Sequence, residues 1–132
     1  MKFEFLEHTA DVKMRVFGKT REEIFKNAVL GMAEIQKSSK LQFKIKKLIK
    51  IKSQDPETIF VDFLSAVLTQ SDIEHAVFSE VKIKRMTDTE IEAEIFGAKV
   101  DKFDEDIKAV TYHSAEVKQK NEKWEAMVLF DV

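Results

Sequence analysis

Oxygen-donor groups stand at two places in the sequence where strands are expected to begin or end. The sequence closes on Asp131 and Val132, so an expected strand over residues 123–132 delivers a side-chain carboxylate and then the main-chain carboxylate of Val132. Asp11 immediately precedes another expected strand. Hard oxygen donors of this kind are the ligands that Ca²⁺ and Mg²⁺ prefer. If Asp11 converges on the other two residues, the three form a cation site; the alternative is a frayed, solvated terminus.

Two further clusters of polar residues accompany expected strands. In the segment EHTADV, residues 7–12, His8, Thr9 and Asp11 crowd polar groups immediately before a strand. This placement predicts either a site at the end of a sheet or a turn in which Thr9 and Asp11 satisfy nearby main-chain amides. The second cluster, TYH at residues 111–113, lies inside an expected strand. It favours a buried, hydrogen-bonded tyrosine and histidine, with a functional site as the alternative.

Several kinds of chemistry are not expected. The chain has no cysteine, which removes disulfides, thiolate metal sites and cysteine nucleophiles, and its three glycines form no phosphate-binding loop. The histidines, His8, His75 and His113, lie far apart and lack helical ligand spacing, which argues against a histidine-rich zinc site. A metal-dependent hydrolase built on Asp11, Asp131 and His113 lacks an evident nucleophile and base, so we expect no catalytic activity of the chain's own.

Length and composition set the class of protein. The 132 residues, 44% hydrophobic and 35% charged, fit a single folded domain over residues 1–132. A net charge of -2 gives no strong attraction to nucleic acid or to anionic lipid. Residues 1–10 mix charged and apolar side chains, and no run approaches the roughly 18 apolar residues of a membrane helix. We therefore expect a cytoplasmic protein with no membrane contact.

The spacing of apolar residues predicts an α+β fold. Thr20 and Glu23 form a capping box for a helix that runs to about residue 34, and Asp55 with Pro56 begins a second helix. Period-two alternation and turn residues predict strands over residues 12–18, 41–51, 76–85, 89–97, 107–118 and 123–132. Hairpin turns are expected at residues 87–88 and 121–122. The expected architecture is a mostly antiparallel sheet with two helices packed on one face.

Two runs of like charge also need an explanation. Residues 37–52 contain seven lysines and no acid, whereas residues 88–106 contain eight acids and two lysines. The simpler interpretation is that both runs form solvated outer faces of neighbouring strands in one sheet. The alternative is a docking surface for a protein or for RNA.

Several segments together resemble the archease family. They are EHTADV leading to FGKT at residues 17–20, the second helix with the following VFSE at residues 77–80, and KAVTYH at residues 108–113. The final segment, residues 124–132, ends in an aspartate and an aliphatic residue and is also similar to that family. The resemblance extends, in order, along essentially the whole chain.

The resemblance implies an accessory protein that activates a GTP-dependent tRNA-splicing RNA ligase by promoting its guanylylation and multiple turnover. A chaperone or specificity modulator of a tRNA cytosine methyltransferase is the alternative, and in either role tRNA is contacted indirectly. The family's metal site carries over to Asp11, Asp131 and Val132, with Ca²⁺ as the first expectation and Mg²⁺ or Mn²⁺ as alternatives. His8 and His113 carry over as neighbours of the site rather than as ligands. The metal used in the cell, the dominant partner and the oligomeric state stay open.

Overall fold

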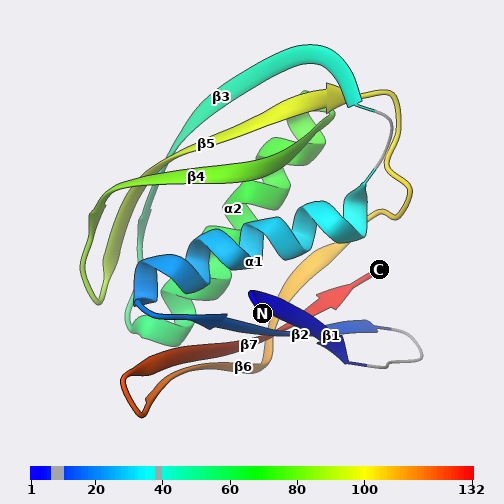
Figure 1. The fold of residues 1–132 in the computed structure, drawn as a ribbon. Helices are drawn as coiled ribbons and strands as arrows, with labels where there is room; N and C mark the ends of the chain where they lie inside the picture. The colour runs from blue at the N-terminus through cyan, green and yellow to red at the C-terminus, as the bar shows by residue number, and fades with distance from the viewer. Residues whose placement is uncertain (7–10, 38–39) are drawn as a thin grey trace.

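The strands of the chain form two antiparallel sheets with both helices between them (Figure 1). The structure is a computed structural model that describes residues 1–6, 11–37 and 40–132, with the backbone alone for residues 40–43. One sheet has the strand order β1-β2-β7-β6 and the other the order β3-β5-β4. The strands are β1 (Phe3–Leu6), β2 (Asp11–Gly18), β3 (Lys40–Lys52), β4 (Ala76–Met86), β5 (Glu90–Val100), β6 (Ala109–Lys120) and β7 (Lys123–Asp131), and the helices are α1 (Arg21–Gln36) and α2 (Pro56–Glu74).

The α+β class is confirmed, and the antiparallel strands divide into two sheets where one was expected. Helix α1 packs on β2 and β4, whereas α2 packs on β6 and β3, so each sheet receives both helices on one face. The division follows from the helices, because the buried residues of α2 cover a broad arc of its surface and need strands on two sides. Period-two alternation identifies the buried face of each strand but not which strands share a sheet.

Both predicted helix starts are confirmed by their capping hydrogen bonds. The Thr20 side chain accepts from the main-chain N–H of Glu23 at 3.1 Å. Asp55 accepts from the main-chain N–H of Thr58 at 2.8 Å, with Pro56 at the first helical position. These bonds satisfy amides that the first helical turn leaves without a partner. The sequence therefore sets where each helix begins, although α1 runs two residues beyond its predicted end.

The core lies between the sheets and is built around aromatic rings of the two helices. Phe25 of α1 packs edge-on against Phe60 of α2, with ring centroids 5.2 Å apart and an interplanar angle of 77°. Phe63 lies on the next turn of α2, 5.5 Å from the same ring. All three rings are fully buried. This aromatic layer holds the sheets at a fixed separation and so fixes the outward-facing residues of β2 and β7.

The two charge runs occupy neighbouring strands of the three-stranded sheet, as predicted. Strands β3 and β5 pair along most of their lengths. On the outer face, Lys46 reaches Glu94 at 3.3 Å and Lys50 reaches Glu92 at 3.6 Å. The hydrogen bond from Lys46 lowers the pKa of Glu94 below its ordinary value. The opposite charges thus pair across the sheet, as in other exposed cross-strand pairs.

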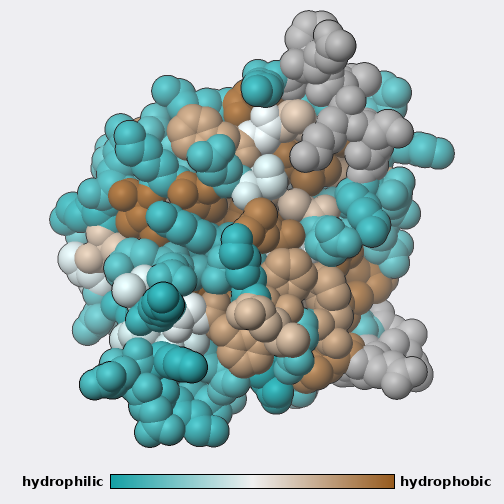
Figure 2. Space-filling model, viewed as in Figure 1, coloured by the Kyte–Doolittle hydropathy of each residue, from teal (hydrophilic) through white to brown (hydrophobic). Residues whose placement is uncertain are grey.

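Strand β1 is an element that the alternation pattern does not predict. Its four residues pair with β2, and the rings of Phe3 and Phe5 lie 5.4 Å apart. Figure 2 shows hydrophobic residues gathered over this edge strand and the adjoining part of α1, where Phe5 is 40% exposed.

Neither α1 nor α2, in the part of the chain that the structure describes, is long and apolar enough to cross a membrane.

Candidate functional site

The pairing of β2 with β7 places Asp11 directly opposite Asp131. Residues directly opposite each other in an antiparallel pair project from the same face of the sheet, with Cβ atoms about 4.5–5.5 Å apart. The next pair is Val12 and Phe130, and Phe130 is fully buried against the helices. Because side chains alternate between faces, the two carboxylates project from the outer face of the four-stranded sheet.

The end of β7 is held on both sides. Asp131 pairs with Asp11 of β2 and also with Ala109 of β6. The main-chain N–H of Lys108 donates to the main-chain oxygen of Asp131 at 2.6 Å, and Val132 packs against the core with its side chain half-buried. The backbone here is therefore fixed by strand pairing, which is not the frayed terminus of the alternative interpretation.

The residues present at this end fit a cation with oxygen ligands. Among the described residues, no three His, Asp or Glu side chains lie close enough to hold a metal ion together. The oxygen donors on the described residues here are two carboxylates, Asp11 and Asp131, and the main-chain carbonyl oxygen of Val132. These are hard donors suited to Ca²⁺, Mg²⁺ or Mn²⁺, with water completing the coordination. His8 and Thr9 of the same motif lie outside the described residues.

The TYH motif lies in a wide bulge of β6, next to the aspartate pair. The register of β6 on β7 shifts between Thr111 and Glu116, so residues 112–115 stand opposite a single residue of β7. Ser114 has a positive φ of 61°, which few residues other than glycine adopt. Bulges of this kind re-aim side chains and occur often beside functional sites.

The bulge makes one sequence-based expectation wrong. Tyr112 is 59% exposed and His113 is also exposed, where burial was expected. The physical reason is that the extra residues interrupt the alternation that would have turned one of these side chains into the core. The expected hydrogen bond does form, because the Tyr112 hydroxyl donates to Asp62 of α2 and this bond raises the pKa of Tyr112.

Thr111 provides a further polar group on the same face as the aspartate pair. It stands opposite Leu129, one step along the face from Ala109 and Asp131. Its hydroxyl oxygen is buried and has no hydrogen-bond partner among the described residues. Burying a hydroxyl group without a hydrogen-bond partner costs free energy. The hydroxyl of Thr111 is therefore available to bind a ligand or a water molecule near the aspartate pair.

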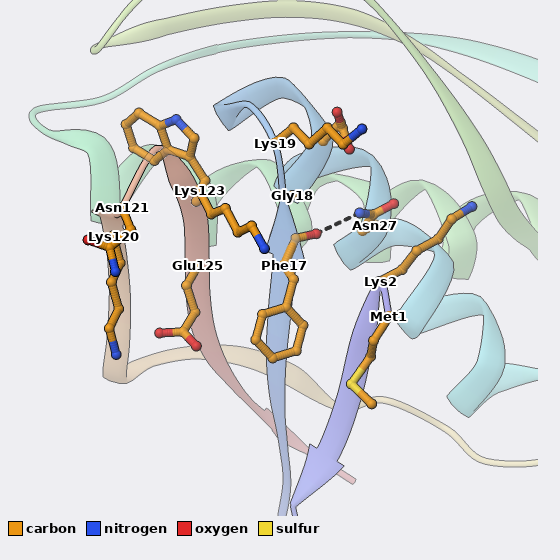
Figure 3. A pocket seen from close by; sticks show the side chains of 12 residues that line it. Met1, Lys2, Phe17, Gly18, Lys19, Asn27, Lys120, Asn121, Lys123 and Glu125 are labelled. Carbon is orange, nitrogen blue, oxygen red and sulfur yellow. Dashed lines mark hydrogen bonds between the residues drawn. The ribbon is translucent and has the colours of Figure 1, made fainter.

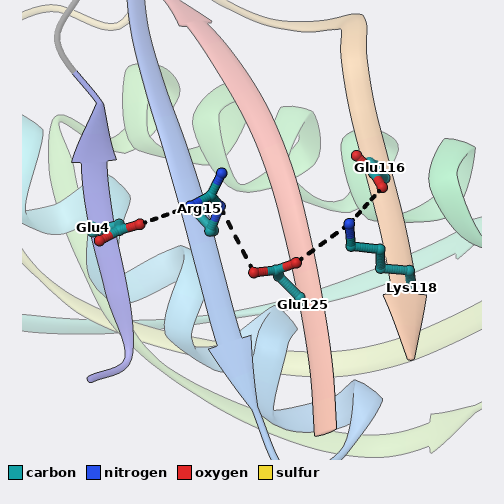
Figure 4. Close-up of polar contacts among 5 residues, drawn as sticks. All are labelled: Glu4, Arg15, Glu116, Lys118 and Glu125. Atoms are coloured by element: carbon teal, nitrogen blue, oxygen red, sulfur yellow. Dashed lines mark hydrogen bonds and ion pairs between the residues drawn. The ribbon is translucent and has the colours of Figure 1, made fainter. Parts of the chain in front are cut away.

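A row of ion pairs crosses the middle of this outer face (Figure 4). Arg15 of β2 reaches Glu4 of β1 at 3.1 Å and Glu125 of β7 at 3.7 Å. Lys118 of β6 reaches Glu116 at 3.1 Å and Glu125 at 3.5 Å. These two carboxylates, Glu116 above all, raise the pKa of Lys118. The row joins all four strands and separates the aspartate pair from the opposite end of the sheet.

At that opposite end lies a cleft of about 720 Å³ that sequence analysis did not predict (Figure 3). Its lining residues come from the ends of four strands and from α1, and they include Phe17, Trp124 and several lysines. The FGKT segment contributes Phe17, Gly18 and Lys19, but the other lining segments are as distant in sequence as residues 1–2 and 120–125, so no local pattern predicts the cleft.

The chain matches a known protein family and curated members of it along nearly its whole length. The model of the Archease protein family matches residues 3–132. Protein archease of Methanosarcina barkeri is 36% identical over 99% of this chain and 96% of its own length, and protein archease of Thermoplasma volcanium is 35% identical over the full length of both.

Two solved structures have the same fold as this chain. The solution structure of protein 1598 of Methanobacterium thermoautotrophicum superimposes with a TM-score of 0.80 at 28% identity, covering 98% of each chain. A crystal structure from Thermotoga maritima, described as an archease and possible chaperone, has a TM-score of 0.71 at 23% identity and covers 96% of this chain and 94% of its own. The chain, which carries paired aspartates at one end of its four-stranded sheet and matches this family along its length, belongs to the archease family.

Proposed function

We propose that this archease-family chain is a non-catalytic, metal-binding activator of a GTP-dependent tRNA-splicing RNA ligase, promoting the ligase's guanylylation and multiple turnover. Family membership supports an accessory role. The observation that carries the proposal is the aspartate pair, in which Asp11 and Asp131 face each other on an outer face that a partner can reach. Two like charges held opposite each other destabilise a sheet unless a cation lies between them.

In this proposal Asp11, Asp131 and Val132 hold one divalent cation, Ca²⁺ first, with Mg²⁺ or Mn²⁺ as alternatives. The bound ion supplies positive charge and coordination positions at the surface. The strand pairing of β2, β7 and β6 fixes the carboxylates before the partner arrives, so little ordering is needed on binding. The exposed Asp131 then faces the ligase, where it helps to assemble the geometry that guanylylation requires.

The test measures ligase guanylylation and RNA joining with and without stoichiometric amounts of this protein. Wild type is expected to accelerate both steps, and Asp11→Ala and Asp131→Ala to abolish the acceleration while keeping the circular dichroism spectrum unchanged. Asp101→Ala, at an exposed aspartate between β5 and β6, is the matched control and should stimulate like wild type. Full stimulation by both site variants would remove the metal mechanism, and no stimulation by wild type would remove the activator role.

A second candidate function is a chaperone or specificity modulator of a tRNA cytosine methyltransferase, favoured by the outer face of β3. Leu48 is 54% exposed there, within a row of lysines that includes Lys44, Lys46 and Lys50. An exposed apolar side chain with a charged rim is the composition of a protein-docking patch. Tested against the methyltransferase, Leu48→Glu and the triple reversal of the three lysines to glutamate should each weaken binding. Unchanged binding by both variants would exclude this face.

A further inference from the structure

The cleft at the end of the four-stranded sheet opposite the aspartate pair combines aromatic and cationic groups. Phe17 lies opposite Glu125 in the register of β2 on β7, and Trp124 lies opposite Gly18. Both aromatic side chains are half-buried and both line the cleft. A volume of about 720 Å³ is within the range of small-molecule and cofactor sites, which is roughly 300–1,000 Å³.

Four lysines surround these aromatic residues. They are exposed, they come from the ends of four strands, and they are Lys2 before β1, Lys19 after β2, Lys120 at the end of β6 and Lys123 at the start of β7. Figure 3 shows Lys123 extending toward Phe17, with Lys2 and Lys19 on the other side of that strand. Phe17 and Trp124 belong to adjacent pairs of the register and therefore project from opposite faces of the sheet, with Trp124 packed toward the core. The ring of Phe17 thus forms the aromatic wall of the cleft, Trp124 lines its inner side, and the lysines form a cationic margin.

The charge of this margin is not neutralised within the described part of the chain. None of the four lysines forms an ion pair with a described residue, whereas Lys46, Lys50 and Lys118 elsewhere on the sheets all do. Of the two acids that line the cleft, Glu125 is already engaged by Arg15 and Lys118. The four cations are thus available to an anionic ligand.

The backbone keeps the cleft in shape. The side-chain amide of Asn27 in α1 donates to the main-chain oxygen of Phe17 at 2.7 Å, which ties the strand end to the helix. The main-chain N–H of Phe17 donates to the oxygen of Lys2 at 2.9 Å. A Cβ at Gly18 would lie 2.7 Å from the Cβ of Glu23, so only glycine lets the strand approach the helix this closely. The aromatic wall is consequently held in place before any ligand binds.

From these observations we infer that the cleft binds a nucleotide unit of single-stranded RNA, with a base against the aromatic wall and its phosphates on the lysines. A flat aromatic ring beside unpaired lysines is the combination that single-stranded nucleic-acid sites use, since stacking tolerates any base and the cations follow the backbone. A duplex keeps its bases stacked internally and offers no free ring face. The inference concerns a different end of the molecule from the aspartate pair and needs no bound metal.

The test uses the isolated protein and an oligoadenylate of about six nucleotides, within the site sizes of single-stranded binders. Trp124 is the single tryptophan of the chain, so quenching of intrinsic fluorescence reports on the cleft directly. Engagement of four phosphates predicts that affinity falls roughly 50-fold between about 50 and 200 mM salt, from a slope near -0.7 per phosphate contact. Adenosine monophosphate, measured alongside, distinguishes a free nucleotide from an RNA strand as the source of the same chemistry.

Two variants and a matched control make the test specific. Lys19→Gln with Lys123→Gln should halve the salt slope, and Phe17→Leu should weaken binding about fivefold or more through lost stacking. Lys82→Gln with Lys102→Gln removes the same charge from exposed lysines elsewhere and should bind like wild type. Because Phe17→Leu could disturb folding, its thermal unfolding is compared with wild type, and the lysine pair tests the site independently.

The outcomes separate clearly. Quenching by the oligoadenylate that both site variants weaken and the control preserves supports the assignment. Tighter binding of adenosine monophosphate than of the oligoadenylate would overturn RNA as the ligand in favour of a free nucleotide. Absence of quenching and of binding at low salt would overturn it. Equal affinity for polyglutamate would also overturn it, because the cleft would then recognise negative charge alone.

Discussion

Neutralising one member of the aspartate pair is expected to change stability in opposite directions with and without Ca²⁺. Asp11 and Asp131 are direct cross-strand partners on an exposed face, and like charges in that arrangement are destabilising. Asp131→Asn keeps the size and shape of the side chain and removes one of the two charges. The metal-free variant should therefore be more stable than metal-free wild type, which is an unusual result for a change at a functional site.

The magnitudes follow from the geometry. Relief of a directly opposed like-charge pair is worth about 0.2–1 kcal/mol in unfolding free energy. In a domain of this size that corresponds to a rise in Tm of roughly 1–4 °C. Ca²⁺ at about 100 times its Kd stabilises a binding-competent wild type by about 2.7 kcal/mol, or roughly 10 °C in Tm. The variant should lose most of that second gain.

The assay is differential scanning calorimetry in EDTA and in Ca²⁺, with Asp101→Asn as the control. That variant removes one exposed carboxylate outside the strand pair and should follow wild type in both buffers. A Tm for Asp131→Asn that falls in EDTA would refute the electrostatic reasoning. A Ca²⁺-induced gain equal to that of wild type would show that Asp131 is not a ligand.

Three further changes probe the fold and the bulge. The main-chain N–H of Thr58 donates to Asp55 and lowers the pKa of this carboxyl below its ordinary 3.8. The cap therefore stabilises the fold above pH 3.8, and this stabilisation is lost as the pH falls through the lowered pKa of the folded protein. The urea midpoint of Asp55→Ala should accordingly approach that of wild type in acid. Gly97→Ala would bring a Cβ within 2.3 Å of the main-chain oxygen of Val77, so the backbone of one strand would have to move. Urea denaturation should show that the free energy of unfolding falls by about 1–3 kcal/mol or more. Tyr112 is the single tyrosine, so ultraviolet titration should find its midpoint above pH 10.0, and Asp62→Asn should lower it; an unchanged midpoint would show that the hydrogen bond is absent in solution.

Sequence patterns predict the elements of this fold better than their assembly. The caps at Thr20 and Asp55 are local, because each side chain contacts an amide three residues away, and both were predicted. The hairpin turns join β4 to β5 and β6 to β7 as expected. The short strand β1 was missed because four largely apolar residues are too few for a period, and the division into two sheets depends on contacts between distant segments.

The same distinction applies to the candidate sites. The convergence of Asp11 on Asp131 could be predicted because both residues stand at strand ends, and the register now places them opposite each other. The exposure of Tyr112 could not be predicted, since the bulge is a property of how β6 pairs with β7. The cleft around Phe17 and Trp124 was missed for a related reason, because its cations come from four strand ends and no single segment contains it.

The two ends of the β2–β7 pair should act independently. Gly18 lies seven positions after Asp11 along β2, so the aspartate pair and the cleft lie about 24 Å apart along the strand. That distance is more than twice the roughly 8–10 Å over which charges interact at ordinary salt, and the exposed ion pairs around Arg15 contribute little energy with which to couple them. Combining Asp131→Asn with Lys123→Gln should therefore give additive changes in Ca²⁺ response and RNA affinity. A marked non-additivity would mean that β2 and β7 transmit strain between the ends, and that a cation at one end sets the shape of the other.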